Sequence, residues 1–475
     1  MFICDEDLWA LRTFGHAELG DARRTSRLVR MSAAIARHPR FSVDAACGGN
    51  VAEAEGAHRL VRNPSFGAGA IFDAGATSTA GAAAQEPGDL LALEDSTTLS
   101  FPHSVAEDLG DVGGERSSKK GGWWVHSTLL FAVQQQLPLG PITQQRWCRP
   151  MGGRGRAKQR RERAYEEKES FKWEQASRDM ERRLGAETMR RVISVCDREA
   201  DVFEYLAYKK ENGQRFVVRS SWDRKINWED TAERRYLWEI MEGTEIGGRC
   251  KFVIPQRGGR RKRTAELSYR FRQVTLALPK RRRTTAKEPL TMWVLYVKED
   301  APPEGTEGLE WMLLTSEPMD GVEQAMQVLG HYRARWKIED WHKAWKSGCG
   351  VEDRRQQERA NLEKVAVITA FVAIRMLQLR ALANVDEEVP CEQVLQEMEW
   401  KCLWLSVQKT ALPANQPGVR WAHRAIGKLG GWKDSKQDGR IGWQLLYRGW
   451  TKLQDMTAGF RLALSYQSAS GNATK

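Results

Sequence analysis

The sequence predicts a multidomain α/β protein, in which a mixed α/β core with a long β-rich insertion is flanked by helical segments. The chain has 475 residues, enough for two or three domains with substantial cores. From residue 89 onward, short β-branched runs alternate with longer helical periods, in the order strand, strand, strand, helix, strand, helix. Residues 221–319 hold several short β-like runs, whereas both ends of the chain have helical periodicity.

The expected elements can be given in chain order. Residues 1–68 should be helical and include a basic helix over residues 18–38. The core strands are expected at Leu90–Leu93, Trp123–Gln135, Pro141–Cys148 and Val192–Cys196, and the core helices at Lys168–Leu184 and Glu199–Lys209. The insertion strands are expected at Cys250–Ile254, Val274–Leu278 and Met292–Val297.

The second half of the chain should be mainly helical. Asp320 and Glu323 form a capping-box variant at the start of a helix that ends near Gly348 and Gly350. Another helix is expected over Asn361–Leu382. Within Trp400–Lys475, apolar side chains recur every three or four residues, which indicates a packing seam inside the monomer or between subunits: Trp443, Leu446, Trp450, Leu453, Thr457 and Phe460. The predicted domains therefore cover residues 1–68, 69–386 and 387–475.

Composition narrows the class of partner and the cell compartment. The net charge of +12 favours a polyanionic partner, which leaves ribosomal, membrane-surface and nucleic-acid roles open. The eight cysteines include no CxxC pair and no zinc-ligand spacing, as expected for reduced thiols. Acidic residues 5–7 argue against a signal peptide, and the apolar run Val365–Ile374 is too short to span a membrane. We therefore expect a soluble, intracellular protein.

One helical stretch, residues 332–346, has two different faces. Tyr332, Arg335, Glu339 and Lys346 fall within roughly 60° of arc if the helix is regular. The opposite side is apolar, as expected for a helix seated on a core: Ala334, Ile338, Trp341 and Trp345. A lone carboxylate among Tyr, Arg and Lys suits a metal ion and a phosphodiester. The same pattern also fits the solvated face of an ordinary amphipathic helix.

Two aspartates stand where predicted strands end. Leu90–Leu93 leads to Asp95, and Val192–Cys196 leads to Asp197. Either aspartate alone could be a turn or N-cap residue. Together with Glu339 they would offer three carboxylates, and carboxylate oxygens suit Mg²⁺ and two-metal phosphoryl transfer.

These residues resemble the insertion-sequence-four family of DDE transposases, which includes the transposase of transposon five. Its signature of Tyr, two residues, Arg, three residues, Glu, six residues and Lys is met by Tyr332, Arg335, Glu339 and Lys346. Further likeness lies in residues 93–100, 122–127, 195–201, 215–220 and 311–318, and it extends from about Leu19 to about Phe460. The segment after Gly350 diverges from the family.

The resemblance implies a ribonuclease-H-like core and a cut-and-paste reaction on double-stranded DNA. Asp95, Asp197 and Glu339 would hold two Mg²⁺ ions, with Mn²⁺ as an alternative. Tyr332, Arg335 and Lys346 would position phosphates near the cut, where a freed 3′-hydroxyl forms a hairpin before the end joins target DNA. The family position of each remaining candidate implies a DNA contact: Arg24 and Arg27 to the transposon end, Trp311 and Trp336 to an extruded base, and Arg198, Arg219, Lys343 and Arg355 elsewhere.

The resemblance also implies a homodimer in the DNA complex and a place in the bacterial cytoplasm, associated with the nucleoid. Three basic runs are usually solvated loops in other proteins, with DNA contact as the alternative: residues 154–163, 257–263 and 280–283. No specific role is assigned to the run at 154–163.

Two other functional classes remain. One is a two-metal nuclease or resolvase on the same fold, which would cut without joining. The other is a DNA-binding repressor or inactive inhibitor, which would be expected to lack a carboxylate. A phosphatase of the Asp-x-Asp-x-Thr type is excluded, because Thr97 stands where its second aspartate belongs.

Overall fold

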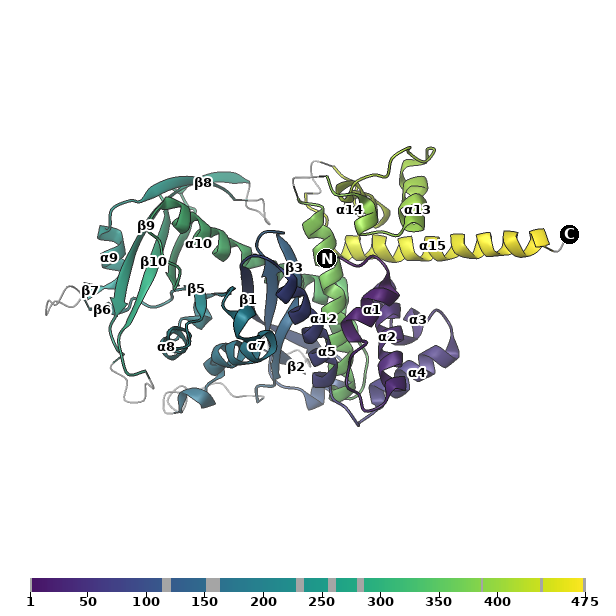
Figure 1. The fold of residues 1–475 in the computed structure, drawn as a ribbon, viewed down its shortest axis with the longest axis horizontal. Helices are drawn as coiled ribbons and strands as arrows, with labels where there is room; N and C mark the ends of the chain where they lie inside the picture. The colour runs from purple at the N-terminus through teal and green to yellow at the C-terminus, as the bar shows by residue number, and fades with distance from the viewer. Residues whose placement is uncertain are drawn as a thin grey trace.

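A large mixed sheet and two helical regions meet at one long central helix (Figure 1). The computed structural model describes residues 2–112, 121–150, 163–227, 235–254, 262–279, 286–385, 388–435 and 439–472. The basic runs at 154–163, 257–263 and 280–283 fall almost wholly outside these residues. A multidomain α/β architecture with a helical N-terminus is therefore confirmed.

The N-terminal region is built from five helices: α1 (Glu6–Phe14), α2 (Ala22–Arg37), α3 (Val43–Ala46), α4 (Val51–Arg62) and α5 (Ala68–Gln85). Helix α2 begins at the N-cap Asp21, whose carboxylate accepts a hydrogen bond from the backbone N–H of Arg23 at 2.8 Å. Leu28, Met31 and Ile35 recur at helical spacing along α2 and are buried. The predicted basic helix over residues 18–38 is thus confirmed, with its arginines on the outer side of an apolar face.

The sheet has eleven strands in the order β3-β2-β1-β4-β5-β11-β10-β9-β6-β7, with β8 paired to β9. Their bounds are β1 (Leu90–Phe101), β2 (Gly121–Ala132), β3 (Leu137–Trp147), β4 (Val192–Cys196), β5 (Arg215–Arg219), β6 (Lys225–Ile226), β7 (Arg235–Tyr236), β8 (Gly248–Ile254), β9 (Arg263–Leu276), β10 (Leu290–Glu299) and β11 (Glu310–Thr315). Among the strands that the structure describes, the β1–β4 and β4–β5 pairs are parallel and the other pairs are antiparallel. The insertion strands extend the core sheet through the antiparallel β5–β11 pair.

Strand β1 is longer than the sequence suggested. We expected the strand to end before Asp95, and this was wrong, because β1 continues to Phe101. Its second half stays paired with β2 through Phe101↔Gly121, and residues 96–98 are Ser-Thr-Thr, of which threonine favours extended structure. Only the parallel pairing with β4 stops early, at Leu93↔Val195.

Helices cover the sheet and connect it to the C-terminal region. The helices that follow the first strands are α7 (Lys172–Met189), α8 (Phe203–Glu211) and α9 (Leu237–Gly243). After the sheet come α10 (Val322–Ala334), α11 (Trp336–Lys343), α12 (Arg359–Leu382), α13 (Glu397–Gln408), α14 (Val419–Leu429) and α15 (Trp443–Asn472). Helix α10 starts at Gly321 without a side-chain cap, so the predicted Asp320 cap was wrong.

Helix α12 is the central element of the molecule. It is long and apolar enough to cross a membrane, but 94% of its apolar window is buried inside the protein. It packs against α2, α4 and α5 of the N-terminal region, β3 of the sheet and α14 of the C-terminal region. These contacts identify α12 as a core helix that the three parts of the chain share.

Helix α15 forms an arm that leaves the body of the protein (Figure 1). The first five positions of the predicted seam, Trp443 to Thr457, are buried within the monomer. Phe460 is 46% exposed, so the seam ends where the arm begins. Beyond it, Leu462, Leu464 and Tyr466 are also exposed.

A buried ion pair fixes the N-terminus to α12. Arg375 is almost fully buried and donates a hydrogen bond to the Glu6 carboxylate at 2.7 Å and another to the Ile3 carbonyl at 2.8 Å. Replacing Arg375 with Ala leaves the buried Glu6 carboxylate with the 3.9 Å ion pair to Arg37 but without its hydrogen-bonded partner, so we expect the free energy of unfolding to fall by about 3–5 kcal/mol. Chemical denaturation would measure this loss. Arg59→Ala, which removes an exposed arginine paired with Glu55, is the control and should change stability very little.

Candidate active site

Sheet topology places two of the three predicted carboxylates at the same edge. The parallel β1–β4 pairing ends at Leu93↔Val195, and Asp95 and Asp197 each follow two residues later. Asp197 also caps the short helical turn that follows, because its carboxylate accepts from the backbone N–H of Glu199 at 2.9 Å. Its sequence position is therefore explained in part by ordinary capping.

The third carboxylate arrives on α11, which packs against β1. Glu339 accepts a hydrogen bond from the guanidinium of Arg335 at 3.2 Å. Burial opposes the charge on Arg335, yet Tyr332 and the carboxylates of Asp95, Glu339 and Asp197 raise its pKa. Arg335 and Glu339 are therefore paired at the start of α11, the helix that packs against the strand carrying Asp95.

Asp95 lies in an environment that opposes its negative charge. Burial raises the pKa of Asp95 to about 7, Arg335 opposes the rise, and Asp197 and Glu339 add to it. A carboxylate with this environment is stabilised in its charged form by added positive charge. The chemistry of this donor set fits divalent cations such as Mg²⁺, which also take water and substrate phosphate as ligands. Among the described residues, no group of three or more acidic, histidine or cysteine side chains has an arrangement that could hold a metal ion, so the Mg²⁺ site stays a prediction.

His342 is a site residue that the sequence interpretation missed. Its Nδ1 lies 3.8 Å from a carboxylate oxygen of Asp95. Burial lowers the pKa of His342 to about 3, and nearby Lys346, His126 and Lys343 act in the same direction. The imidazole is therefore neutral at physiological pH. Its position three residues after Glu339, on the same side of a helix, was the available signal.

The predicted regular helix through residues 332–346 is interrupted. Arg335 separates α10 from α11, and residues Ala344–Gly348 form a π-helical turn that carries Lys346. Burial lowers the pKa of Lys346, whereas Glu352 and Asp95 raise it. Glu352 and Asp95 thus favour the charged form of the Lys346 ammonium. As predicted, Ile338, Trp341 and Trp345 are buried on the other side.

Aromatic rings line the side of the cluster nearest the insertion. The Trp311 ring on β11 makes an edge contact with Tyr332, with 6.0 Å between ring centroids. Phe252 of β8 touches the other side of Trp311, at 5.9 Å between centroids. The Arg335 guanidinium lies 5.4 Å from the ring centroid of Trp336, which is 46% exposed. Phe252 was not predicted, because the sequence alone does not show that β8, paired with β9, places this ring next to Trp311 of β11.

The weaker DNA-contact candidates lie around this cluster without forming one site. Arg198 follows Asp197 and is exposed, and Lys343 is exposed on α11. Arg219 donates to the Glu310 carbonyl at 2.9 Å, and Arg355 is exposed after Arg354. Their roles in DNA binding stay predictions.

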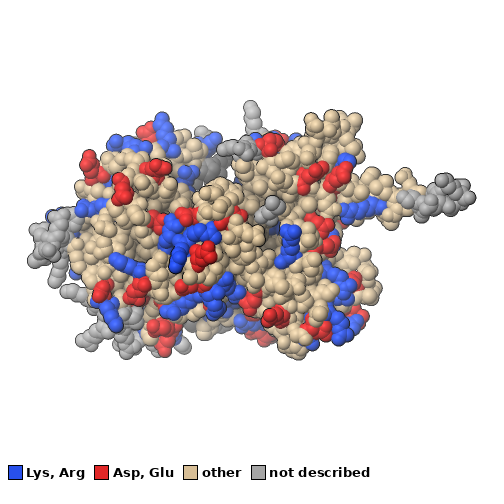
Figure 2. Space-filling model, in the orientation of Figure 1, with Lys and Arg blue, Asp and Glu red and all other residues tan. Residues whose placement is uncertain are grey.

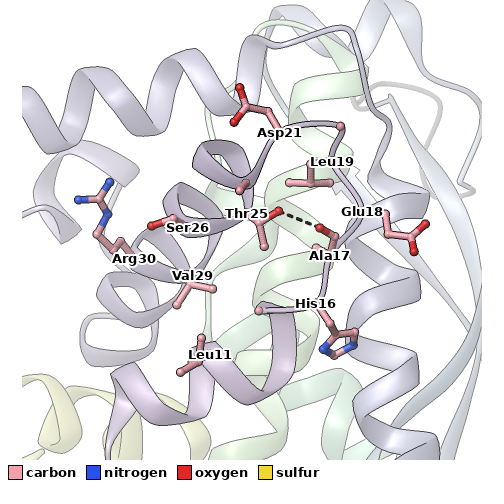
Figure 3. A pocket seen from close by; sticks show the side chains of 13 residues that line it. Leu11, His16, Ala17, Glu18, Leu19, Asp21, Thr25, Ser26, Val29 and Arg30 are labelled. Carbon is pink, nitrogen blue, oxygen red and sulfur yellow. Dashed lines mark hydrogen bonds between the residues drawn. The ribbon is translucent and has the colours of Figure 1, made fainter.

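The N-terminal candidates lie in a separate region. Arg24 donates to the Leu19 carbonyl at 2.9 Å, and Arg27 forms an ion pair with Glu53. Beside them is an open groove of about 690 Å³ between α1 and α2 (Figure 3). Its wall includes Leu11, Val29 and Arg30, and Thr25 donates to the Ala17 carbonyl at its rim.

The comparison with protein families identifies this N-terminal region. Residues 6–66 match the family model described as transposase DNA-binding. Helices α1–α4 therefore form a transposase DNA-binding domain, and DNA is a partner of this chain. The arginines of α2 lie within the matched residues, and the match supports a DNA-binding role for the N-terminal region. Contacts of Arg24 and Arg27 with a transposon end stay predictions.

One prediction tests the arginine assignment inside this domain. Arg24→Ala should weaken binding to a specific transposon end roughly tenfold to a hundredfold, because a charge-assisted hydrogen bond to phosphate is lost. Fluorescence anisotropy with labelled end DNA at several salt concentrations would measure the affinity. Arg461→Ala removes the same charge from α15 and should leave end binding unchanged. Equal affinity of the Arg24 variant and wild type would remove Arg24 from the DNA interface.

Proposed function

We propose that this chain is a cut-and-paste DNA transposase that cleaves and joins DNA by DDE chemistry. The observation that carries the proposal is the position of Asp95 and Asp197 directly after the parallel β1–β4 pairing, with Glu339 on α11, which packs against β1. The same chain matches a transposase DNA-binding model over residues 6–66. The mixed order of β1 to β5, with carboxylates beside the β1–β4 edge, supports a ribonuclease-H-like core.

The metal requirement follows from the donor set. Asp95, Asp197 and Glu339 would hold two Mg²⁺ ions, or Mn²⁺ in their place. When bound, such ions activate the attacking water or 3′-hydroxyl and stabilise the leaving oxygen of a phosphodiester. Around them, Arg335 offers a planar fork to a phosphate, and Lys346 offers a compact charge.

The aromatic side chains suit the nucleotide next to the cut. Trp311, held between Tyr332 and Phe252, presents a fixed ring, and Trp336 presents a half-exposed one. Stacking of a base on such a ring contributes about 1–3 kcal/mol. An extruded base held there would let the DNA backbone bend into the hairpin that the mechanism requires.

The chain would act as a dimer on DNA in the bacterial cytoplasm, associated with the nucleoid. The arm of α15 exposes four large apolar or aromatic side chains to a second subunit: Phe460, Leu462, Leu464 and Tyr466. On the face of Figure 2, basic and acidic side chains are interspersed, with Lys and Arg gathered near the middle. DNA binding would therefore rely on local clusters of basic side chains as well as on the net charge of +12.

A plasmid assay tests the proposal. Purified protein and Mg²⁺ are incubated with a supercoiled plasmid that carries the gene's flanking inverted repeats, and the ends are resolved on a denaturing gel. We expect an excised fragment with hairpin ends, absent with Glu339→Ala. Glu323→Ala removes an exposed carboxylate from α10 and is the matched control that should cut normally.

The same gel separates the alternatives. Cutting without hairpins or joined products would indicate a nuclease or resolvase. Specific end binding with no cutting by wild type would indicate a regulator of transposition.

A further inference from the structure

Lys346 lies in a segment with unusual backbone geometry. The backbone N–H of Cys349 donates to the Ala344 carbonyl at 2.8 Å, which is the five-residue spacing of a π-helix. We call Ala344–Gly348 the π turn. Such turns are rare and are frequently found at functional sites. One residue more per turn rotates everything that follows by roughly 100° relative to a regular helix. The π turn therefore decides which way the Lys346 side chain points.

The central helix α12 packs against the π turn. Trp345, which is buried, donates through Nε1 to Thr369 Oγ1 at 3.0 Å and to the Ala366 carbonyl at 3.2 Å. Its ring also stacks on Trp341 of α11, with 5.6 Å between centroids. These contacts fix one side of the π turn but do not touch the backbone on either side of Lys346.

The C-terminal region holds the far end of the π turn through one side chain. Tyr447 of α15 is fully buried, and its ring occupies the space beside Gly348. A Cβ atom at Gly348 would lie 2.2 Å from Cε2 of that ring, so only glycine fits here. The thiol of Cys349 donates to the Tyr447 hydroxyl at 3.3 Å. The Tyr447 ring and hydroxyl thus fix the backbone of Gly348 and Cys349, which follow Lys346 in the chain.

The DNA-binding domain reaches the same turn from the other side. Arg40, which follows α2, donates from Nη1 to the Ser347 carbonyl at 2.5 Å and pairs through Nη2 with Asp353 at 3.1 Å. Arg354, which is buried, bridges the same two regions, because it donates to the Cys349 carbonyl at 3.1 Å and to the Pro39 carbonyl at 2.5 Å. The residue next to Lys346 is therefore bonded to the N-terminal domain.

We propose that Arg40 and Tyr447 are positioning residues for Lys346, which they orient by fixing the π turn from the N-terminal and C-terminal regions. The role of Lys346 in cleavage rests on the proposed function. Neither Arg40 nor Tyr447 touches the acidic cluster, so both act through the backbone of residues 347–349. A shift of about 1 Å in a phosphate-binding group can lower a reaction rate roughly a hundredfold.

The experiment measures cutting separately from binding. Single-turnover strand cleavage is followed on end DNA that is already bound to the full-length protein, and end affinity is measured in parallel. Tyr447→Leu removes the aromatic ring that packs beside Gly348, whereas Tyr447→Phe keeps the ring and removes the hydroxyl. Arg40→Ala removes the hydrogen bond to the Ser347 carbonyl. Tyr236→Leu makes the same exchange at an exposed position of β7 and is the control.

We expect Tyr447→Leu to slow cleavage roughly tenfold to a hundredfold, with end affinity changed by less than about twofold. Arg40→Ala should slow cleavage severalfold, and because Arg40 is partly exposed it tests the proposal even if Tyr447→Leu folds poorly. Tyr447→Phe should keep most of the rate. The decisive comparison repeats each change in a Lys346→Ala background, where a residue that acts through Lys346 should have almost no further effect.

Three results would count against the proposal in different ways. Losses that multiply unchanged in the Lys346→Ala background would show that Arg40 and Tyr447 act independently of Lys346. Wild-type cleavage rates for both Arg40→Ala and Tyr447→Leu would overturn the positioning role directly. A wild-type protein that binds the ends but never cuts them would overturn the proposed function, and the role of Lys346 with it.

Discussion

Asp197→Asn should lower strand cleavage by about a thousandfold or more while the protein folds normally and binds transposon ends with unchanged affinity. Removing one carboxylate from the acidic cluster costs several kcal/mol of charge stabilisation in the transition state, and about 4 kcal/mol corresponds to a thousandfold. The choice of asparagine is deliberate, because its side-chain oxygen can still cap the turn at Glu199, as Asp197 does.

Asp197→Ala separates the two roles of this residue. Alanine removes both the charge and the cap, so it should lose the same cleavage activity and a further ~1 kcal/mol of stability. Cleavage would be followed by the single-turnover gel assay, and stability by denaturant unfolding. If Asp197→Asn cut DNA at the wild-type rate, Asp197 would be only a capping residue.

Arg335→Ala should have an effect of similar size for a different reason. An arginine that neutralises charge on a phosphoryl group in the transition state is typically worth 10³–10⁵ in rate, so we expect a loss of at least roughly a thousandfold. Arg335→Lys should recover only part of this, because lysine lacks the planar fork that binds two phosphate oxygens. End binding, which belongs to the N-terminal domain, should not change in either variant.

The pH dependence gives Arg335→Ala a second measurable consequence. Burial already raises the pKa of Asp95 to about 7, and Arg335 is the largest influence that lowers it. Without the guanidinium this pKa rises further, so more of Asp95 is protonated at neutral pH. Since the reaction needs the carboxylate, residual activity should fall off at higher pH on the acid side than in wild type. A residual activity with the wild-type pH profile would contradict the contact between Arg335 and Asp95.

The sequence was most informative where function and local pattern coincide. Val192–Cys196 was predicted with its observed bounds, because a β-branched run between a helix and an acidic turn is typical of a short buried strand. The three acidic candidates were likewise predicted from the strand positions and the helix face together. Asp95 was selected because the strand was expected to end before it, and this reason was partly wrong. Strand β1 continues past Asp95 in its pairing with β2, whereas its pairing with β4 ends at Leu93.

What the sequence could not predict depends on contacts between distant segments. Phe252 reaches Trp311 only because β8 folds back along β9. Tyr447 reaches Gly348 from almost one hundred residues away, and no local pattern signals that contact. The sequence of the π turn predicts a regular helix, because its residues have ordinary helical preferences. The wider turn is selected by tertiary packing.

The bonds between α12 and the N-terminal region bear on the distance between two sites on the DNA, the recognised base pairs and the phosphate that is cut. Lys364 donates to the carbonyls of Val61 and Asn63 at the end of α4, while Arg375 binds the residues before α1. The N-terminal domain is therefore bonded at two points to α12, which also packs against α11. A rigid helix shared in this way holds the two regions at a fixed distance from each other. If the chain cuts DNA as proposed, the recognised base pairs and the cut phosphate would lie a fixed number of base pairs apart. Because DNA turns once in about 10.5 base pairs, half a turn of extra sequence would then present the phosphate on the wrong side.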